Sequence, residues 1–190
     1  MRNAKATIRN LALGLGLLGI ISLAGEAVAA PEKPQFSCNG LQATVVGTDG
    51  SDLLSSQEGV SDIVVALSGD DVVQAQGEDT VCAGSGDDDI RGAAKWTEGG
   101  SGSDRMEADG KSPANFYGGD GDDLLVGSRA GQRDYLYGGS GDDRVFGRGG
   151  REYMRGGSGD DHLVGGAGGD VAWGGDGIDF CLAREVHNCE

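Results

Sequence analysis

Acidic side chains are crowded at short intervals along this chain, and the stretch GGDGDDLLV (118–126) is the clearest example. It places Asp120, Asp122 and Asp123 directly before three apolar residues. Carboxylates this close repel one another and resist burial unless a cation lies between them. Calcium is a hard ion that takes six to eight oxygen ligands from carboxylates and backbone carbonyls. The chemistry open to such a stretch is therefore the binding of a hard divalent cation.

A six-residue version of this pattern recurs eight times. Every copy has Gly at its fourth position and Asp at its sixth, with an apolar residue or Cys two positions further on. One such turn alone is usually an Asx turn, but eight at regular spacing are not expected by chance. The eight loops are GTDGSD (47–52), ALSGDD (66–71), AGSGDD (83–88), GGSGSD (99–104), GGDGDD (118–123), GGSGDD (138–143), GGSGDD (156–161) and GGDGID (174–179).

The residues after each loop must form the elements that position it. With Gly118 as position 1, the stretch fits G-G-x-G-x-D-x-U-x, where U is a large apolar residue. Glycine allows tight turns, and positions 7–9 form a minimal strand with U inward and its neighbours outward. We therefore expect an all-β fold with one thin apolar column and no deep core. The inward column consists of Val45, Leu54, Val64, Val73, Val81, Ile90, Thr97, Met106, Phe116, Leu125, Leu136, Val145, Met154, Leu163, Ala172 and Cys181.

The nonapeptide resembles the RTX, or haemolysin-type, calcium-binding repeat over about residues 43–182. The lead-in, CNG (38–40) followed by VVGTDGSDLL, is similar to small secreted calcium-binding proteins of actinobacteria. The resemblance implies a parallel β-roll, an RTX-type β-solenoid in which two nonapeptides make one coil and alternate loops stack on opposite edges. It implies an N-terminal cap segment at 30–42, the roll at 43–182 and a C-terminal cap at 183–190.

The resemblance also implies which residues bind metal. In the family, the position-6 Asp bridges the calcium ions above and below it, and the glycine-rich turn exposes its carbonyls. Eight stacked loops leave seven gaps, so we expect up to about seven Ca²⁺ ions. Position-5 acids such as Asp122 are expected to be solvated. The expected metal-binding residues are Asp52, Asp71, Asp88, Asp104, Asp123, Asp143, Asp161 and Asp179, with Gly50, Gly69, Gly86, Gly102, Gly121, Gly141, Gly159 and Gly177.

The loops of the opposite edge are far less regular, and only GGAGGD (165–170) is a full match. Nearly all insertions and deletions fall on this edge. Loops that stack against a shared ion cannot change length freely, whereas ion-free loops can. We therefore predict one metal-binding edge, the regular edge, and one largely metal-free edge, the irregular edge. The other irregular loops are QEGVSD (57–62), AQGED (75–79), the stretches from Gly92 and Ala108, the segment 127–134 and GRGGRE (147–152).

Arginines gather on the irregular edge. They are either solvated, which we favour for most of them, or fixed cations that replace the lost ion near Asp134 and Glu152. The arginines are Arg129, Arg133, Arg148, Arg151 and Arg155.

Seven of the ten aromatic residues lie in the strands that follow the irregular edge, and all but Phe116 occupy outward positions. Cross-strand packing is one explanation. A surface that binds a glycan or protein partner is the other, and we weigh packing somewhat above it. The outward aromatics, as candidate partner-binding residues, are Trp96, Tyr117, Tyr135, Tyr137, Tyr153 and Trp173.

The first 29 residues have the layout of a secretory signal peptide. Arg2, Lys5 and Arg9 form a basic start, 11–24 is an apolar run and 27–29 is a small-residue cleavage site. The run is shorter than the roughly 20 residues that span a bilayer, so a membrane anchor is disfavoured and we expect no membrane span in the mature chain. The protein is expected to be secreted.

The four cysteines all lie outside this segment, and none forms a CxxC pair. In an exported chain an even count favours disulfides. Three pairings are open, and we favour Cys38–Cys82 with Cys181–Cys189 because each pair lies near one end of the chain.

The net charge of the chain limits the classes of partner that it can bind. The formal charge is −16, and removal of Arg2, Lys5, Arg9 and Glu26 with the signal peptide lowers it to −18. Such acidity argues against nucleic acid and anionic membranes as partners. No HExxH, GxSxG or Cys–His signature is present. We therefore expect a secreted, non-catalytic calcium-binding protein whose folding is coupled to ion binding, or alternatively an extracellular adhesin that uses its aromatic face.

Overall fold

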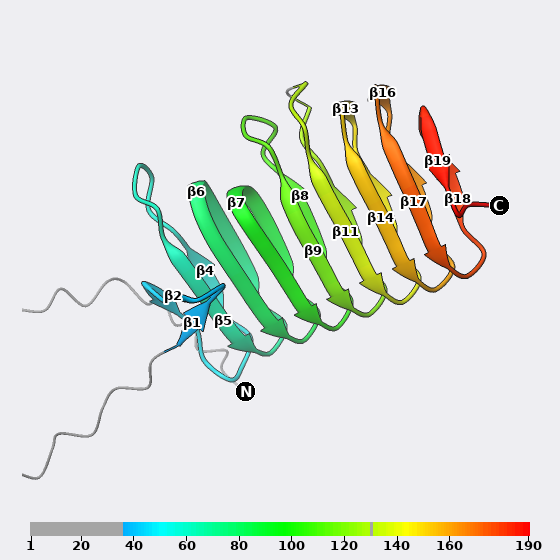
Figure 1. Ribbon diagram of the computed structural model, residues 1–190. Helices are drawn as coiled ribbons and strands as arrows, with labels where there is room; N and C mark the ends of the chain where they lie inside the picture. Colours follow the sequence, from blue (N-terminus) through cyan, green and yellow to red (C-terminus); the bar gives the residue numbers. More distant parts are fainter. Residues whose placement is uncertain (1–35, 130) are drawn as a thin grey trace, which may run out of the picture.

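The chain winds into a stack of coils built from parallel strands (Figure 1). The computed structural model describes residues 36–129 and 131–190, and this part of the chain contains strands and no α-helix. The all-β parallel roll expected from the sequence is confirmed. The expected signal peptide at 1–29 lies outside the described residues. Within them, no helix is long and apolar enough to cross a membrane.

Two facing walls of strands form the roll. They join into one continuous sheet because β6 (Val72–Ser85) and β7 (Asp89–Ser101) each run from the second wall into the first. The first wall also contains β3 (Val45–Val46), β5 (Ile63–Ser68), β9 (Asn115–Asp120), β11 (Tyr135–Ser140), β14 (Tyr153–Ser158), β17 (Val171–Asp176) and β19 (Glu185–His187). The second wall also contains β4 (Leu53–Ser55), β8 (Arg105–Ala108), β10 (Leu124–Val126), β12 (Arg144–Phe146), β15 (His162–Val164) and β18 (Phe180–Leu182).

The register of each wall places equivalent residues of successive coils beside one another. Leu125 of β10 pairs with Met106 and Val145, the inward residues of the coils on either side. Parallel pairing in this register stacks every inward side chain on its counterparts. The apolar column predicted from the sequence follows directly from this stacking.

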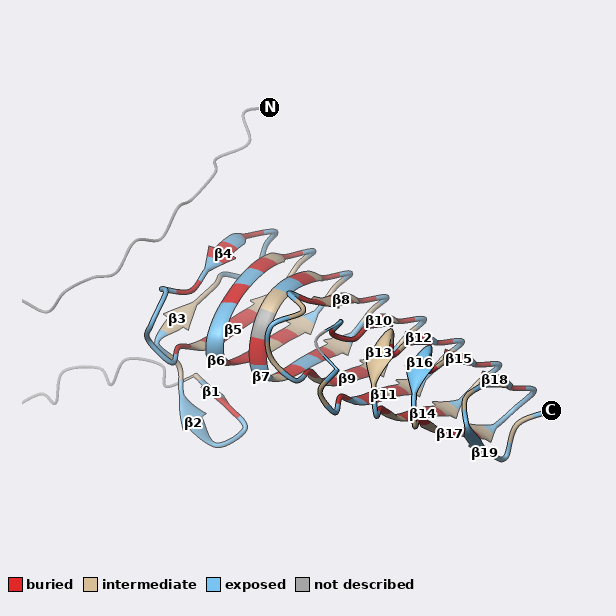
Figure 2. Cartoon of the chain, turned by 90° about the horizontal axis from the view of Figure 1, so that it is seen from above, coloured by how far each residue is buried: buried red, intermediate tan, exposed pale blue. Residues whose placement is uncertain are grey.

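The core is a single narrow column between the walls, and buried residues alternate with more exposed ones along the strands (Figure 2). Leu125, Leu136 and Leu163 are fully buried. The predicted inward residues at the two ends of the stack, Val45 and Cys181, are only half-buried. Because each coil buries little on its own, stability is approximately a sum over neighbouring coils.

The two edges differ as expected from the sequence. Figure 1 shows short, uniform turns along the regular edge and longer, uneven loops along the irregular edge, where β13 (Gly149–Gly150) pairs with β16 (Ala167–Gly168). The uniform turns depend on glycine. Gly119 has φ of +123°, and a Cβ added there would overlap the backbone carbonyl oxygen of Gly100 in the preceding coil.

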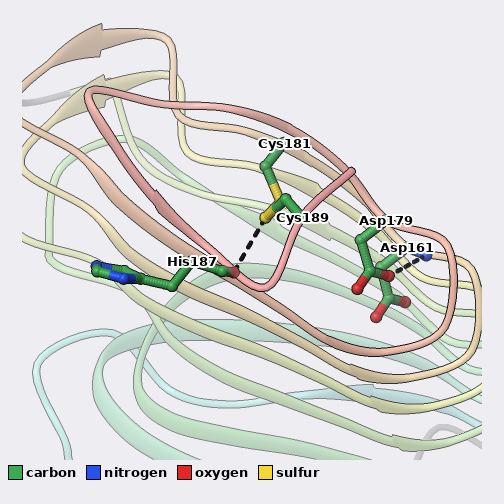
Figure 3. Close-up of a disulfide and its surroundings, with 5 residues drawn as sticks. All are labelled: Asp161, Asp179, Cys181, His187 and Cys189. Carbon is green, nitrogen blue, oxygen red and sulfur yellow. Dashed lines mark hydrogen bonds between the residues drawn. A yellow bond between two sulfur atoms is a disulfide. The ribbon is translucent and has the colours of Figure 1, made fainter.

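Disulfides tie down both ends of the roll. Cys38 lies in the hairpin of β1 (Ser37–Cys38) and β2 (Leu41–Gln42) and is bonded to Cys82, and Cys181 is bonded to Cys189. The favoured pairing is confirmed. The second disulfide closes the turn that follows the last coil (Figure 3).

Candidate metal centre

The eight position-6 aspartates of the regular edge form a continuous hydrogen-bonded ladder. Each Asp from Asp71 to Asp179 accepts, through Oδ1, a hydrogen bond from the backbone N–H of the Asp one coil earlier, at 2.7–2.9 Å. Figure 3 shows the last rung, between Asp161 and Asp179. The ladder places the carboxylates in one row, as the sequence predicted.

The second carboxylate oxygen in this row has no partner. Oδ2 is buried without a hydrogen bond in Asp71, Asp88, Asp104, Asp123, Asp143, Asp161 and Asp179. An unpartnered buried carboxylate oxygen is costly, and more so when ionised. A row of seven such oxygens is suited to binding cations.

Burial raises the pKa of six of these seven carboxyl groups when no ion is present. Desolvation is the largest cause, and repulsion from neighbouring aspartates adds to it, against the backbone hydrogen bond that lowers the pKa. The pKa rises from 3.8 to about 7 for Asp104, Asp123 and Asp143. It rises to about 6 for Asp71, Asp88 and Asp161. Without a cation, the row resists full ionisation at neutral pH.

In the five loops from residue 99 onward, glycine at position 1 leaves a small space, here called a cradle, beside the free oxygen. A Cβ added at Gly118 would overlap Oδ2 of Asp123 and lie 2.6 Å from the carbonyl oxygen of Gly138. One carboxylate oxygen and a carbonyl of the next loop thus border the same small space. These donors fit a hard cation.

The position-4 glycines, also predicted to take part, stack their backbones directly over one another. A Cβ added at Gly121 would overlap the carbonyl oxygen of Gly102, and one at Gly141 would lie 2.5 Å from that of Gly121. Nowhere in the described residues do three Asp, Glu, His or Cys side chains converge as in a site built from side chains alone. A cation held at this edge would therefore take most of its ligands from backbone carbonyls.

The position-5 aspartates form a second, outer ladder that sequence analysis missed. Asp122 accepts a hydrogen bond from the backbone N–H of Asp142 at 2.8 Å, and Asp142 accepts one from Asp160 at 2.8 Å. The side chains are exposed, as expected, but they also link successive loops. The recurring Asp at position 5 was the available signal.

The irregular edge buries carboxylates too, but it satisfies most of them with protein groups. Oδ2 of Asp62, Asp79 and Asp134 accepts a backbone N–H from its own loop, at 2.6–2.8 Å. This contrast with the regular edge gives a physical basis for a largely metal-free irregular edge.

Glu152 is the exception on the irregular edge. It is fully buried, and neither carboxylate oxygen has a partner. Desolvation, with contributions from Asp170 and Asp134, raises the pKa of Glu152 from 4.5 to about 8. The neutral acid is therefore its stable form at neutral pH.

Arginine does not replace an ion in these contacts. Arg148 pairs with Glu107 at 2.7 Å. Across the described parts of the chain, no ion pair joins an arginine to Asp134 or Glu152. The fixed-cation interpretation of the arginines has no support here.

The outward aromatics of the first wall stack on one another. The ring centroids of Trp96 and Tyr117 lie 4.0 Å apart, and those of Tyr117 and Tyr137 lie 4.8 Å apart. The ladder continues through Tyr153 and Trp173. Because neighbouring rings cover one another's faces, the arrangement favours the packing interpretation.

A second ladder on the other wall escaped sequence analysis. His162 stacks on Phe180 at 4.7 Å and lies 5.9 Å from Phe146. His187 stacks on Trp173 at the end of the first ladder. The two isolated histidines are therefore members of ring stacks.

Fold and site together define a metal-binding β-solenoid with an acidic edge. The family model described as the RTX calcium-binding nonapeptide repeat (4 copies) matches residues 58–90, 117–151 and 146–181. These segments cover more than half of the chain, which therefore belongs to the RTX calcium-binding repeat family. The family's repeats bind calcium and its β-rolls are generally non-catalytic. Among curated proteins and solved structures, nothing matches the chain.

Proposed function

We propose that this chain is an exported, non-catalytic calcium-binding protein that holds its ions between successive loops of the regular edge. The ligands would be the position-6 aspartates, through Oδ2, and backbone carbonyls of the glycine-rich turns. A bound divalent ion supplies the positive charge that the crowded carboxylates require.

The row of seven buried, unpartnered Oδ2 atoms carries this proposal. The same oxygen is hydrogen-bonded within the protein in three irregular-edge aspartates. The two edges share one fold and one residue type, so the difference points to a partner other than protein on the regular edge.

Folding would be coupled to ion binding and, through it, to export. Without ions, repulsion among the aspartates and the conformational entropy of the 34 glycines that follow residue 29 oppose the roll. An ion that binds only the coiled state stabilises it by mass action. Loop affinities of roughly millimolar order would suffice outside the cell. The signal-peptide layout of 1–29 and the two disulfides support an oxidising, extracellular destination.

Circular dichroism of the mature chain tests the coupling. We expect little β-sheet signal in a chelator and a cooperative rise as calcium is added. Magnesium is the matched control, because its smaller, octahedral coordination shell suits carbonyl-rich loops poorly and should leave the signal low. A chelated spectrum identical to the calcium-loaded one would refute the coupling.

A further inference from the structure

The eight loops of the regular edge differ at position 1. The five loops from residue 99 onward all begin with glycine, whereas the second and third begin with Ala66 and Ala83. Strand pairing places these residues at equivalent points, because Leu67 pairs with Gly84 and Gly84 with Gly100. The difference therefore falls at one repeated site in the stack.

In the glycine loops, the absence of a side chain at position 1 lets the carboxylate oxygen and a backbone carbonyl oxygen of the next loop or turn come close together. A Cβ added at Gly99 would overlap Oδ2 of Asp104 and lie 2.7 Å from the carbonyl oxygen of Gly118. The last cradle is completed by the C-terminal turn, because a Cβ at Gly174 would overlap both Oδ2 of Asp179 and the carbonyl oxygen of Asn188.

In the alanine loops, a methyl group stands at the equivalent point. Ala66 and Ala83 are both completely buried and belong to the apolar core. Oδ2 of Asp71 and Asp88 lacks a protein partner in these loops also. The methyl groups, and not hydrogen bonds, therefore distinguish these two gaps.

The first loop begins with glycine, but its carboxylate is already occupied. Oδ2 of Asp52 accepts hydrogen bonds from the backbone N–H of Thr48 at 2.6 Å and from its hydroxyl at 2.9 Å. Asp52 is the one position-6 aspartate of this edge whose Oδ2 is satisfied within its own loop.

We infer that the residue at position 1, together with the satisfied carboxylate of Asp52 in the first loop, decides which sites bind calcium. Ions then occupy the five cradles at Gly99, Gly118, Gly138, Gly156 and Gly174, the last of them between the eighth loop and the C-terminal turn, and the first three gaps stay without metal. This inference rests on the proposed function. Other interactions stabilise the ion-free coils. The Cys38–Cys82 disulfide joins the cap to the coil of β6, and β6 and β7 are the longest strands. The N-terminal coils then form a metal-independent end on which the ion-bound coils stack.

Isothermal titration calorimetry on the mature, oxidised protein tests the inference through the number of calcium ions bound. We expect at most five in the wild type. Ala66→Gly/Ala83→Gly opens two cradles and should raise the number by up to two. Gly118→Ala/Gly138→Ala closes two and should lower it by two, and neither glycine has a left-handed φ that would make alanine strained.

Two control variants lie on the irregular edge. Ala108→Gly removes a buried methyl group away from the regular edge. Gly149→Ala adds a methyl group with no atom closer than 3.9 Å. Neither should change the number of ions.

Six or more ions in the wild type, or an unchanged number in Ala66→Gly/Ala83→Gly, would overturn the inference and leave the proposed function standing. No calcium binding by any variant would instead overturn the proposed function.

Discussion

Buried aspartates on the two edges of this roll have the same backbone setting but different partners. On the regular edge, Oδ2 of Asp123 faces a glycine cradle and has no hydrogen bond. On the irregular edge, Oδ2 of Asp134 accepts the backbone N–H of Ser128 at 2.6 Å. A short hydrogen bond within the loop thus satisfies Asp134, whereas we propose that a calcium ion satisfies Asp123.

Asp123→Asn should weaken calcium binding at the centre of the row. The amide keeps a carbonyl oxygen for the ladder but loses the negative charge that attracts the ion. We expect the calcium midpoint of folding to rise several-fold and the number of bound ions to fall by one or two. Asp122→Asn is the matched control, because that neighbouring side chain is outside the cradle and should change the midpoint little. Equal effects of the two variants would argue against a ligand role specific to position 6.

The burial of Glu152 predicts that the stability of the fold depends on pH independently of the regular edge. Its pKa is about 8 in the fold against 4.5 for the free side chain, so the folded state prefers the protonated form. Stability from this group is complete below about 4.5 and is lost as the pH rises through about 8. Glu152→Gln stays neutral and should avoid this loss. In saturating calcium, thermal melts should agree near pH 5, and the variant should be more stable by at least about 1 kcal/mol at pH 9. If the melting temperatures of the wild type and Glu152→Gln differed by the same amount at pH 5 and pH 9, the prediction would be wrong.

At the scale of elements, the first wall is held by ring stacking on its outer face as well as by its inward column. Tyr117 lies between Trp96 and Tyr137 and stacks on both. Stacked pairs contribute roughly 0.5–1.5 kcal/mol each beyond their burial. The outer face thus supports coils whose inner column is only one residue wide.

Tyr117→Ala should therefore lower the free energy of unfolding by about 1–3 kcal/mol while leaving the number of bound calcium ions unchanged. Denaturant titration in saturating calcium measures the loss. Tyr135→Ala is the control, because Tyr135 is 36% exposed and makes one tilted contact, with Tyr153 at 6.1 Å. A loss as small as that of the control would mean that the ladder is not structural, and the alternative of a partner-binding face would gain weight.

Across the elements, the nonapeptide period was enough to predict the strands, their inward residues and the regular edge. Each strand follows its loop at a fixed offset, so Leu125 and Leu136 could be placed inward from the sequence alone. The second ladder could not be predicted in this way. His162 meets Phe146 and Phe180 only because irregular loops of different length still bring their strands into one register.

The side-chain partners on the irregular edge also could not be predicted from the sequence. The repeat places Asp134 at the end of its loop, but the pattern does not indicate that Ser128 satisfies it. The less favoured interpretation of the arginines placed one of them as a fixed cation beside Glu152. The structure leaves Glu152 buried and without an ion pair, and Arg148 pairs with Glu107 instead. Side-chain partners across coils depend on where long side chains reach, and repeat spacing does not encode that reach.

For the whole molecule, stability is distributed along a single axis. One disulfide joins the N-terminal cap to β6 and the other closes the turn after the last coil, while the apolar column and the acidic row run along the stack. Removal of the predicted signal peptide would leave a charge of −18, which would act against this arrangement at every coil. Cations bound along the regular edge would offset that repulsion where it is most concentrated.

The most direct test is a crystal structure grown in excess calcium, with anomalous diffraction to locate the ions. We expect anomalous peaks along the regular edge, each next to a position-6 Oδ2, and few or none along the irregular edge. An intact roll without anomalous density beside these aspartates would contradict this expectation.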